Sequence, residues 1–203
     1  MELSTIFKSV TEQLSEQQVS LNEADTYNHD HGDHMVQIFN LIQKAVQNKA
    51  DQPVAEQLEY ASHVVEKEAD SGSATLYAQG LSKAAKNLSG SDLGPDSLGI
   101  LVKSLLNVEE PQQIKEEPNL LGSLLSGLTG TTESSNKDQN FGVDDLLKAG
   151  MAFFQSKQEG GSTTDALIGA FMAASPLGQS QHRTMSGSLV ASTIMNFAKS
   201  MNH

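Results

Sequence analysis

The sequence predicts an all-α protein, and three observations lead to this fold class. Apolar residues recur at helical spacing along most of the 203 residues. Prolines, glycines and capping residues stand near the ends of these apolar stripes, where helices usually begin and end. No run alternates β-branched or aromatic residues with polar ones between turn signals, so no strands are expected. The pattern as a whole indicates about eight amphipathic helices.

The expected helices carry apolar stripes at residues 3–14, 38–45, 54–65, 76–88, 98–105, 143–154, 167–172 and 190–201. The third helix follows Pro53, a residue type that is tolerated in the first turn. The fourth ends before Gly90, and the fifth follows Pro95. The seventh follows the sequence STTD, which fits a helix cap.

Residues 107–140 break the helical pattern. This segment is first polar and interrupted by prolines, then apolar but rich in glycine, and finally rich in Ser, Thr and Asn. Either two helical units flank a linker, or one domain carries a loose excursion, and we favour the second because neither flank alone explains the polar loops. We therefore expect a single domain over residues 1–203 with a flexible, linker-like insertion at 107–140, most mobile at 130–140.

The composition excludes several classes of function. The chain has no cysteine, so it contains no disulfide, thiolate zinc site or cysteine nucleophile. Its formal net charge of −12 argues against binding to a nucleic-acid backbone or an anionic membrane. No apolar run has the length of a membrane span, and the N-terminus does not resemble a signal peptide. We expect a cytoplasmic protein.

The stretch LNEADTYNHDHGDHM at 21–35 holds three of the six histidines and is expected to be a long interhelical loop. Asn, Asp, His and Gly favour turns, so a plain polar turn is one interpretation. His29, His31 and His34 allow a transition-metal site as a second interpretation. In a third, the oxygens of Glu23, Asn28 and Asp30 hold Mg²⁺ beside a phosphate, while Gly32 permits a sharp turn into the next helix.

Three blocks of the sequence resemble one known family. NHDHGDHM at 28–35, DSGSATLYAQGLSKAA at 70–85 and ASPLGQSQHRTMSG at 174–187 occur in the order of motifs in the nucleotide-binding L domain of dihydroxyacetone kinases. They also resemble the N-terminal domain of fatty-acid kinases. The resemblance implies an antiparallel eight-helix barrel that holds Mg²⁺ and ADP or ATP in loops at one end. It assigns Glu23, Asn28, Asp30 and His31 to the metal and Gly32, Ser71, Gly72, Ser73 and Gly178 to the nucleotide.

The sequence departs from the family pattern at positions that would contact the metal and the phosphate. Asn28 stands where the family has an aspartate, and His29 stands where it has a glycine. A kinase depends on positioning and electrostatic stabilisation, so lost ligands weaken it directly. We therefore expect weak or no phosphoryl transfer by this chain alone, and a kinase role would need a partner chain that binds the substrate. The histidines leave open a different metal or none, and a non-enzymatic helical protein that binds a partner or an apolar ligand is the alternative.

Overall fold

The computed structural model describes residues 2–107, 168–170, 172–173 and 175–201. All regular secondary structure in these ranges is helical, which confirms the all-α fold class. The elements are α1 (Leu3–Glu16), α2 (Gln18–Ala24), α3 (His31–Asn48), α4 (Val54–Glu68), α5 (Gly72–Asn87), α6 (Pro95–Leu105), the 3₁₀ helix η1 (Pro176–Gln179) and α10 (Gln181–Ser200). The helix expected at 143–154 and the insertion expected beyond residue 107, including 130–140, lie outside the described residues.

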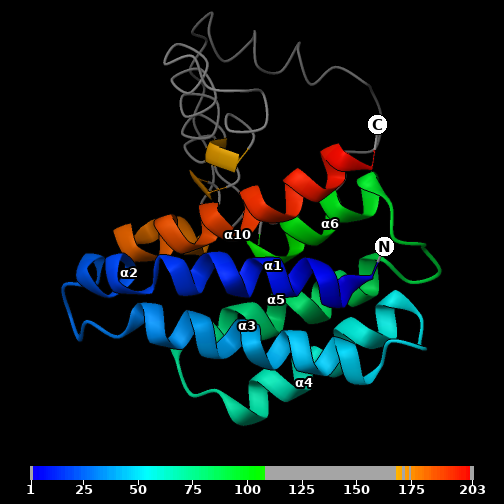
Figure 1. The fold of residues 1–203 in the computed structure, drawn as a ribbon, viewed down its shortest axis with the longest axis horizontal. Helices are drawn as coiled ribbons and strands as arrows, with labels where there is room; N and C mark the ends of the chain where they lie inside the picture. The colour runs from blue at the N-terminus through cyan, green and yellow to red at the C-terminus, as the bar shows by residue number, and fades with distance from the viewer. Residues whose placement is uncertain (1, 108–167, 171, 174, 202–203) are drawn as a thin grey trace, which may run out of the picture.

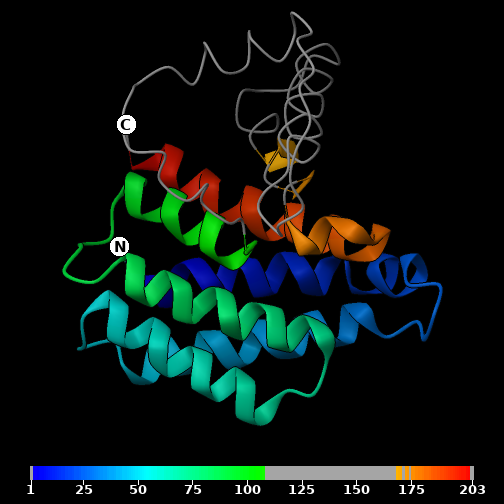
Figure 2. The same ribbon diagram turned by 180° about the vertical axis from the view of Figure 1, so that it is seen from behind.

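The long helices lie side by side and alternate in direction (Figures 1 and 2). α1 packs against α3, α3 against α4, α4 against α5 and α5 against α6. α10, from the other end of the chain, packs against both α6 and α1. As a result, α3, α5 and α10 all begin at the end of the molecule that carries α2 (Figure 1). None of the described helices is long and apolar enough to cross a membrane.

The predicted apolar stripes form the core. Ile6, Phe7, Val10 and Leu14 of α1 are fully buried, as are the matching positions of α3, α5 and α6. Because helical residues three and four apart share a face, each stripe turns one side of its helix inward. The centre of the core is aromatic: the ring of Phe39 lies 5.0 Å from that of Tyr77 in a T-shaped contact.

The prediction of one long loop over 21–35 is wrong at both of its ends. α2 runs to Ala24 and α3 already begins at His31, so the connection is only Asp25–Asp30. The cause is a cap supplied by a different helix. The Asn22 side chain accepts hydrogen bonds from the N–H of Gly32 at 2.6 Å and of Asp33 at 3.3 Å. These donors would otherwise lack partners in the first turn of α3.

Gly32 does not provide the predicted sharp turn, because it lies within the first turn of α3. It is buried at the contact between α2 and α3. A Cβ atom there would overlap the carbonyl oxygen of Gln18 and stand 2.8 Å from Oδ1 of Asn22. The glycine is therefore required by the close approach of two backbones.

Gly32→Ala is expected to lower the free energy of unfolding by about 1–3 kcal/mol, because an overlap with backbone cannot be relieved by a side-chain rotation. Gly99→Ala is the matched control, since Gly99 lies inside α6 with no atom near the added methyl group. The control should be neutral or stabilising, as alanine favours helix over glycine. Urea denaturation of both variants measures the difference. Equal stability of the two would show that α2 does not dock closely on α3.

Candidate functional site

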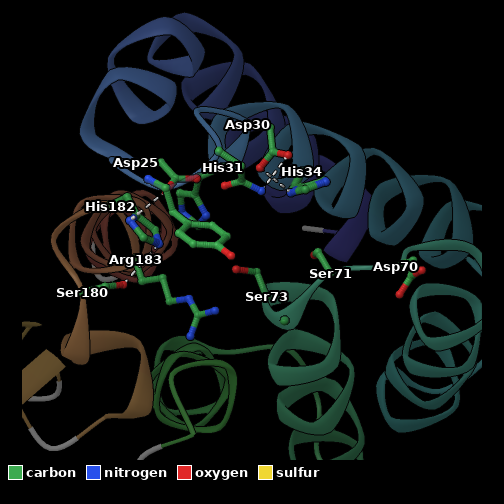
Figure 3. Close-up of a pocket in the computed structure, with 13 residues that line it drawn as sticks. Asp25, Asp30, His31, His34, Asp70, Ser71, Ser73, Ser180, His182 and Arg183 are labelled. Carbon is green, nitrogen blue, oxygen red and sulfur yellow. Dashed lines mark hydrogen bonds and ion pairs between the residues drawn. The ribbon is translucent and has the colours of Figure 1, made fainter.

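A polar pocket of about 560 Å³ lies where α3, α5 and α10 begin. Figure 3 shows its walls, which come from the α2–α3 connection, the start of α5 and the start of α10. The lining residues are Asp25, Tyr27, Asn28, Asp30, His31, His34, Asp70, Ser71, Gly72, Ser73, Ser180, His182 and Arg183. Each of the three sequence blocks thus contributes to one site.

Six of the residues predicted for the site line this pocket: Asn28, Asp30, His31, Ser71, Gly72 and Ser73. Three do not. Glu23 is exposed on α2, and Gly32 is buried between α2 and α3. Gly178 belongs to η1, where a Cβ atom would overlap the carbonyl oxygen of Met172. Both glycines are thus explained by close backbone contacts away from the pocket.

The pocket is also lined by His34, one of the histidines considered for a transition metal, and the structure adds six lining residues that the sequence did not single out: Asp25, Tyr27, Asp70, Ser180, His182 and Arg183. Asp25 is a buried carboxylate, and it lies close in the sequence to Glu23, the carboxylate that was predicted for the site. Asp25 follows the end of α2, whereas Glu23 lies within that helix. Ser180, His182 and Arg183 belong to the third sequence block at 174–187, and this block is the sequence feature from which they could have been predicted.

The three histidines of residues 28–35, His29 in the α2–α3 connection and His31 and His34 in α3, do not converge on one point. Nδ1 of His29 faces the carbonyl oxygen of Asn22 at 3.3 Å. Nε2 of His31 lies 2.9 Å from Oγ of Ser186, and Nδ1 of His34 lies 3.2 Å from Oδ1 of Asp30. Among the residues that the structure describes, no group of three or more His, Asp or Glu side chains is placed to hold a metal ion.

Asn28 and Asp30, two of the predicted magnesium ligands, do point to one another. Nδ2 of Asn28 donates to Oδ2 of Asp30 at 2.9 Å. Between them, His29 has a φ of +58°, a left-handed conformation that favours glycine. The backbone here keeps the shape of a glycine turn while carrying a histidine.

His31 is the buried imidazole of the site, with 4% of its surface exposed. Its ring lies 4.5 Å from the ring of His182. Burial lowers the pKa of His31 to about 4, with a further contribution from the charge of His182 that outweighs the opposing effect of Asp25. At neutral pH, His31 is therefore an uncharged hydrogen-bonding partner of Ser186.

This pKa predicts a loss of stability in mild acid. The folded-state pKa lies below the unfolded value of 6.5, so the unfolded chain takes up the proton first and stability falls as the pH drops from 6.5 towards 4. The loss at pH 4.5 relative to pH 7.5 is expected to be on the order of 2 kcal/mol. Urea unfolding of the wild type and of His31→Gln at both pH values isolates this contribution, because only the wild type should show it. Identical pH profiles would contradict it.

Asp25 is held as a carboxylate despite its burial. Burial raises its pKa, but the N–H of Tyr27 at 3.1 Å, the charge of His182 and the N–H of Asp30 together hold the pKa below its usual value. Oδ1 of Asp25 lies 3.7 Å from Nδ1 of His182. On the other side of that ring, Nε2 lies 3.3 Å from Oγ of Ser180.

Arg183 is the single arginine of the sequence, and it lies in this pocket. Its Nε atom is buried and has no hydrogen-bond partner. Its Nη2 atom would stand 2.9 Å from a Cβ added at Gly72, so the guanidinium lies against the start of α5. A cation beside the positive end of a helix is unfavourable unless an anion joins them. The guanidinium and the start of α5 could together accept an anion.

Comparison with known proteins adds no relative: no family model, no curated protein and no solved structure matches this chain. The chemistry of the pocket is therefore inferred from its own residues. The pocket combines three helix N-termini, a guanidinium without a partner at Nε, and carboxylates on the α2–α3 side.

Proposed function

We propose that this chain is a divergent relative of the L domain of dihydroxyacetone kinases, and that its pocket binds the phosphate groups of a nucleotide together with Mg²⁺. The convergence of the three sequence blocks carries this proposal. Residues 28–34, 70–73 and 180–183 are distant in the sequence and line a single pocket. A chance similarity in three short blocks gives no reason for them to meet.

The order of helix packing supports the related proposal of a barrel. The contacts pass from α1 to α3, α4, α5, α6 and α10, and α10 returns to α1. A closed cycle of antiparallel helices is the arrangement that the family resemblance implies. A nucleotide would then bind at the end where α3, α5 and α10 begin.

The start of α5 and Arg183 form the half of the site that suits a phosphate. Oγ of Ser71 caps α5 by accepting from the N–H of Ala74 at 3.0 Å. The remaining N–H groups of the first turn have no partner within the helix. Helix N-termini carry partial positive charge, and Arg183 adds a full charge with several donors. Together they offer both charge and hydrogen bonds to a phosphate.

Asn28 and Asp30 form the half that suits Mg²⁺. Mg²⁺ in nucleotide sites is held by one or two protein oxygens, by phosphate oxygens and by water. Since the described residues contain no group able to hold a metal without help, the phosphate has to complete the coordination. Metal and nucleotide should accordingly bind together and only weakly apart.

The same residues explain why phosphoryl transfer by the chain alone should be weak or absent. Asn28 contributes no negative charge to Mg²⁺, and the side chain of His29 occupies a turn where a glycine would let the backbone approach a phosphate. Transfer to a small hydroxy-ketone would also need a substrate-binding partner chain. The nucleotide affinity of the unmodified chain should correspond to a dissociation constant on the order of 0.1–1 mM.

Asp30→Ala is the variant that tests the proposal. It removes the only charged oxygen ligand of the proposed magnesium half, so the stimulation of ADP binding by Mg²⁺ should fall at least about tenfold. Titration calorimetry of ADP at several Mg²⁺ concentrations measures it. Asp33→Ala is the control, since Asp33 is exposed, accepts hydrogen bonds from Gln18 and Asn22 of α2, and is not among the residues that line the pocket. Unchanged Mg²⁺ dependence in Asp30→Ala would refute the magnesium site.

A further inference from the structure

A second arrangement in the pocket is independent of the nucleotide. His182 stands between a carboxylate and a hydroxyl, with Nδ1 3.7 Å from Oδ1 of Asp25 and Nε2 3.3 Å from Oγ of Ser180. One neutral tautomer satisfies both contacts: Nδ1–H faces the carboxylate, and Nε2 accepts from the hydroxyl. In an acyl-transfer triad, a carboxylate orients the imidazole base in this way, and the base faces the nucleophilic hydroxyl.

The hydroxyl of Ser180 does not cap its helix, although serine at a helix N-cap usually does. Ser180 is the N-cap residue of α10, yet its side chain accepts no capping hydrogen bond. Among the helices that the structure describes, the two other serine N-caps both do so: Ser71 accepts from the N–H of Ala74 and Ser175 accepts from the N–H of Leu177. Ser180 instead faces His182, and both line the pocket. Helix capping therefore does not explain why its hydroxyl is held there.

The carboxylate of the arrangement is fixed and ionised. Asp25 is 4% exposed and accepts the N–H of Tyr27 at 3.1 Å, which sets its orientation. An ionised, oriented carboxylate on Nδ1 favours the tautomer in which Nε2 can take a proton. The ring of His31 lies 4.5 Å from the ring of His182.

We propose that Ser180, His182 and Asp25 form a nucleophilic triad that hydrolyses small esters bearing an anionic group. Ser180 is the nucleophile, His182 is the general base, and Asp25 is a positioning residue. The anionic group of the ester would bind between Arg183, which follows His182 at the start of α10, and the start of α5 across the pocket (Figure 3). A pocket of about 560 Å³ limits the substrate to a small molecule.

The reaction balances without a cofactor. Oγ of Ser180 attacks the ester carbonyl carbon, its proton passes to Nε2 of His182, and the C–O bond to the alcohol breaks as His182 protonates the departing oxygen. Water then attacks the acyl-serine and gives its proton to His182. The C–Oγ bond breaks, Oγ regains the proton, and the carboxylic acid leaves. The N–H groups that begin α10 lie next to the nucleophile and can stabilise the oxyanion.

Covalent labelling with diisopropyl fluorophosphate in metal-free, nucleotide-free buffer tests the nucleophile. We expect mass spectrometry to find one label, on Ser180, and Ser180→Ala to remove it. His182→Gln should slow labelling about 100-fold or more. His63→Gln is the matched control, because His63 also pairs with carboxylates, Glu59 and Glu66, on the exposed face of α4. A label on another residue, no label, or unchanged labelling of His182→Gln would overturn the proposal.

Two further measurements separate the roles within the triad. Asp25→Asn should lower the maximal rate of labelling at least about tenfold and leave the half-saturating reagent concentration unchanged. With wild type, hydrolysis of mono-4-nitrophenyl succinate should exceed that of neutral 4-nitrophenyl acetate, and Arg183→Gln should raise KM for the anionic ester alone. Equal effects on both esters would remove Arg183 from the substrate site. Because these assays contain no nucleotide or Mg²⁺, their failure would leave the proposed nucleotide site standing.

Discussion

Arg183→Gln is expected to weaken the binding of magnesium–ADP about 10- to 100-fold. A hydrogen bond to a charged group contributes about 1.5–3 kcal/mol, and each 1.4 kcal/mol is a factor of ten in affinity. No other arginine is present in the sequence to replace it. Arg183→Lys should lie between the two, since lysine keeps the charge but lacks the planar set of donors. Titration calorimetry of the three proteins measures the series.

Stability distinguishes a binding role of Arg183 from a structural one. Its Nε atom is buried without a partner, and the guanidinium lies beside the positive end of α5. Removal of such a charge should leave the urea midpoint unchanged or raise it. Loss of nucleotide binding with unchanged stability would support an anion site. A strongly destabilised Arg183→Gln with normal binding would show that the side chain serves packing.

Asn28→Asp combined with His29→Gly should strengthen magnesium–ADP binding about 10- to 100-fold. The first change adds a charged ligand beside Asp30, worth roughly 1.5–3 kcal/mol when it contacts Mg²⁺. The second places glycine where φ is +58°, which removes a strained residue and opens the turn to a phosphate. The single variants are the controls, and Asn28→Asp should give the larger part of the Mg²⁺-dependent gain.

The outcome that would contradict this prediction is a double variant with the affinity of the wild type. The α2–α3 connection would then not be a weakened phosphate–metal site. A coupled assay with dihydroxyacetone and magnesium-ATP gives a second readout. Neither protein should show turnover without a substrate-binding partner chain, because tighter nucleotide binding does not supply the second substrate site. Robust turnover by the unmodified chain would mean that Asn28 and His29 belong to a working variant of the loop.

The long helices could be predicted because each carries its own apolar stripe, which is a local signal. α2 could not: only Leu21 of its residues is buried, and Val19 is 69% exposed. The start of α3 was hidden by residue types that favour turns. Its cap comes from Asn22, ten residues earlier, and a cap from another helix leaves no pattern at the helix that it caps.

The site could be predicted only in part, because local motifs show in the sequence and contacts between distant residues do not. The short blocks pointed to Asn28, Asp30 and Ser71–Ser73, which do meet. The family resemblance assigned Glu23 to the metal, but Glu23 is exposed within α2, and Asp25, just after the end of that helix, takes the buried position. The roles of His182 and Arg183 depend on α10 packing beside the α2–α3 connection, a contact between distant parts of the chain that one sequence does not reveal.

Titration calorimetry of ADP into the unmodified chain, with and without Mg²⁺, tests the central claim most directly. In the proposed site, a phosphate half around Arg183 lies beside an incomplete metal half around Asp30, so each ligand would complete the site of the other. The predicted result is weak binding of one ADP per chain in Mg²⁺ that becomes at least about tenfold weaker when EDTA removes the metal. No binding of ADP at millimolar concentration, or the same affinity with and without Mg²⁺, would contradict the account.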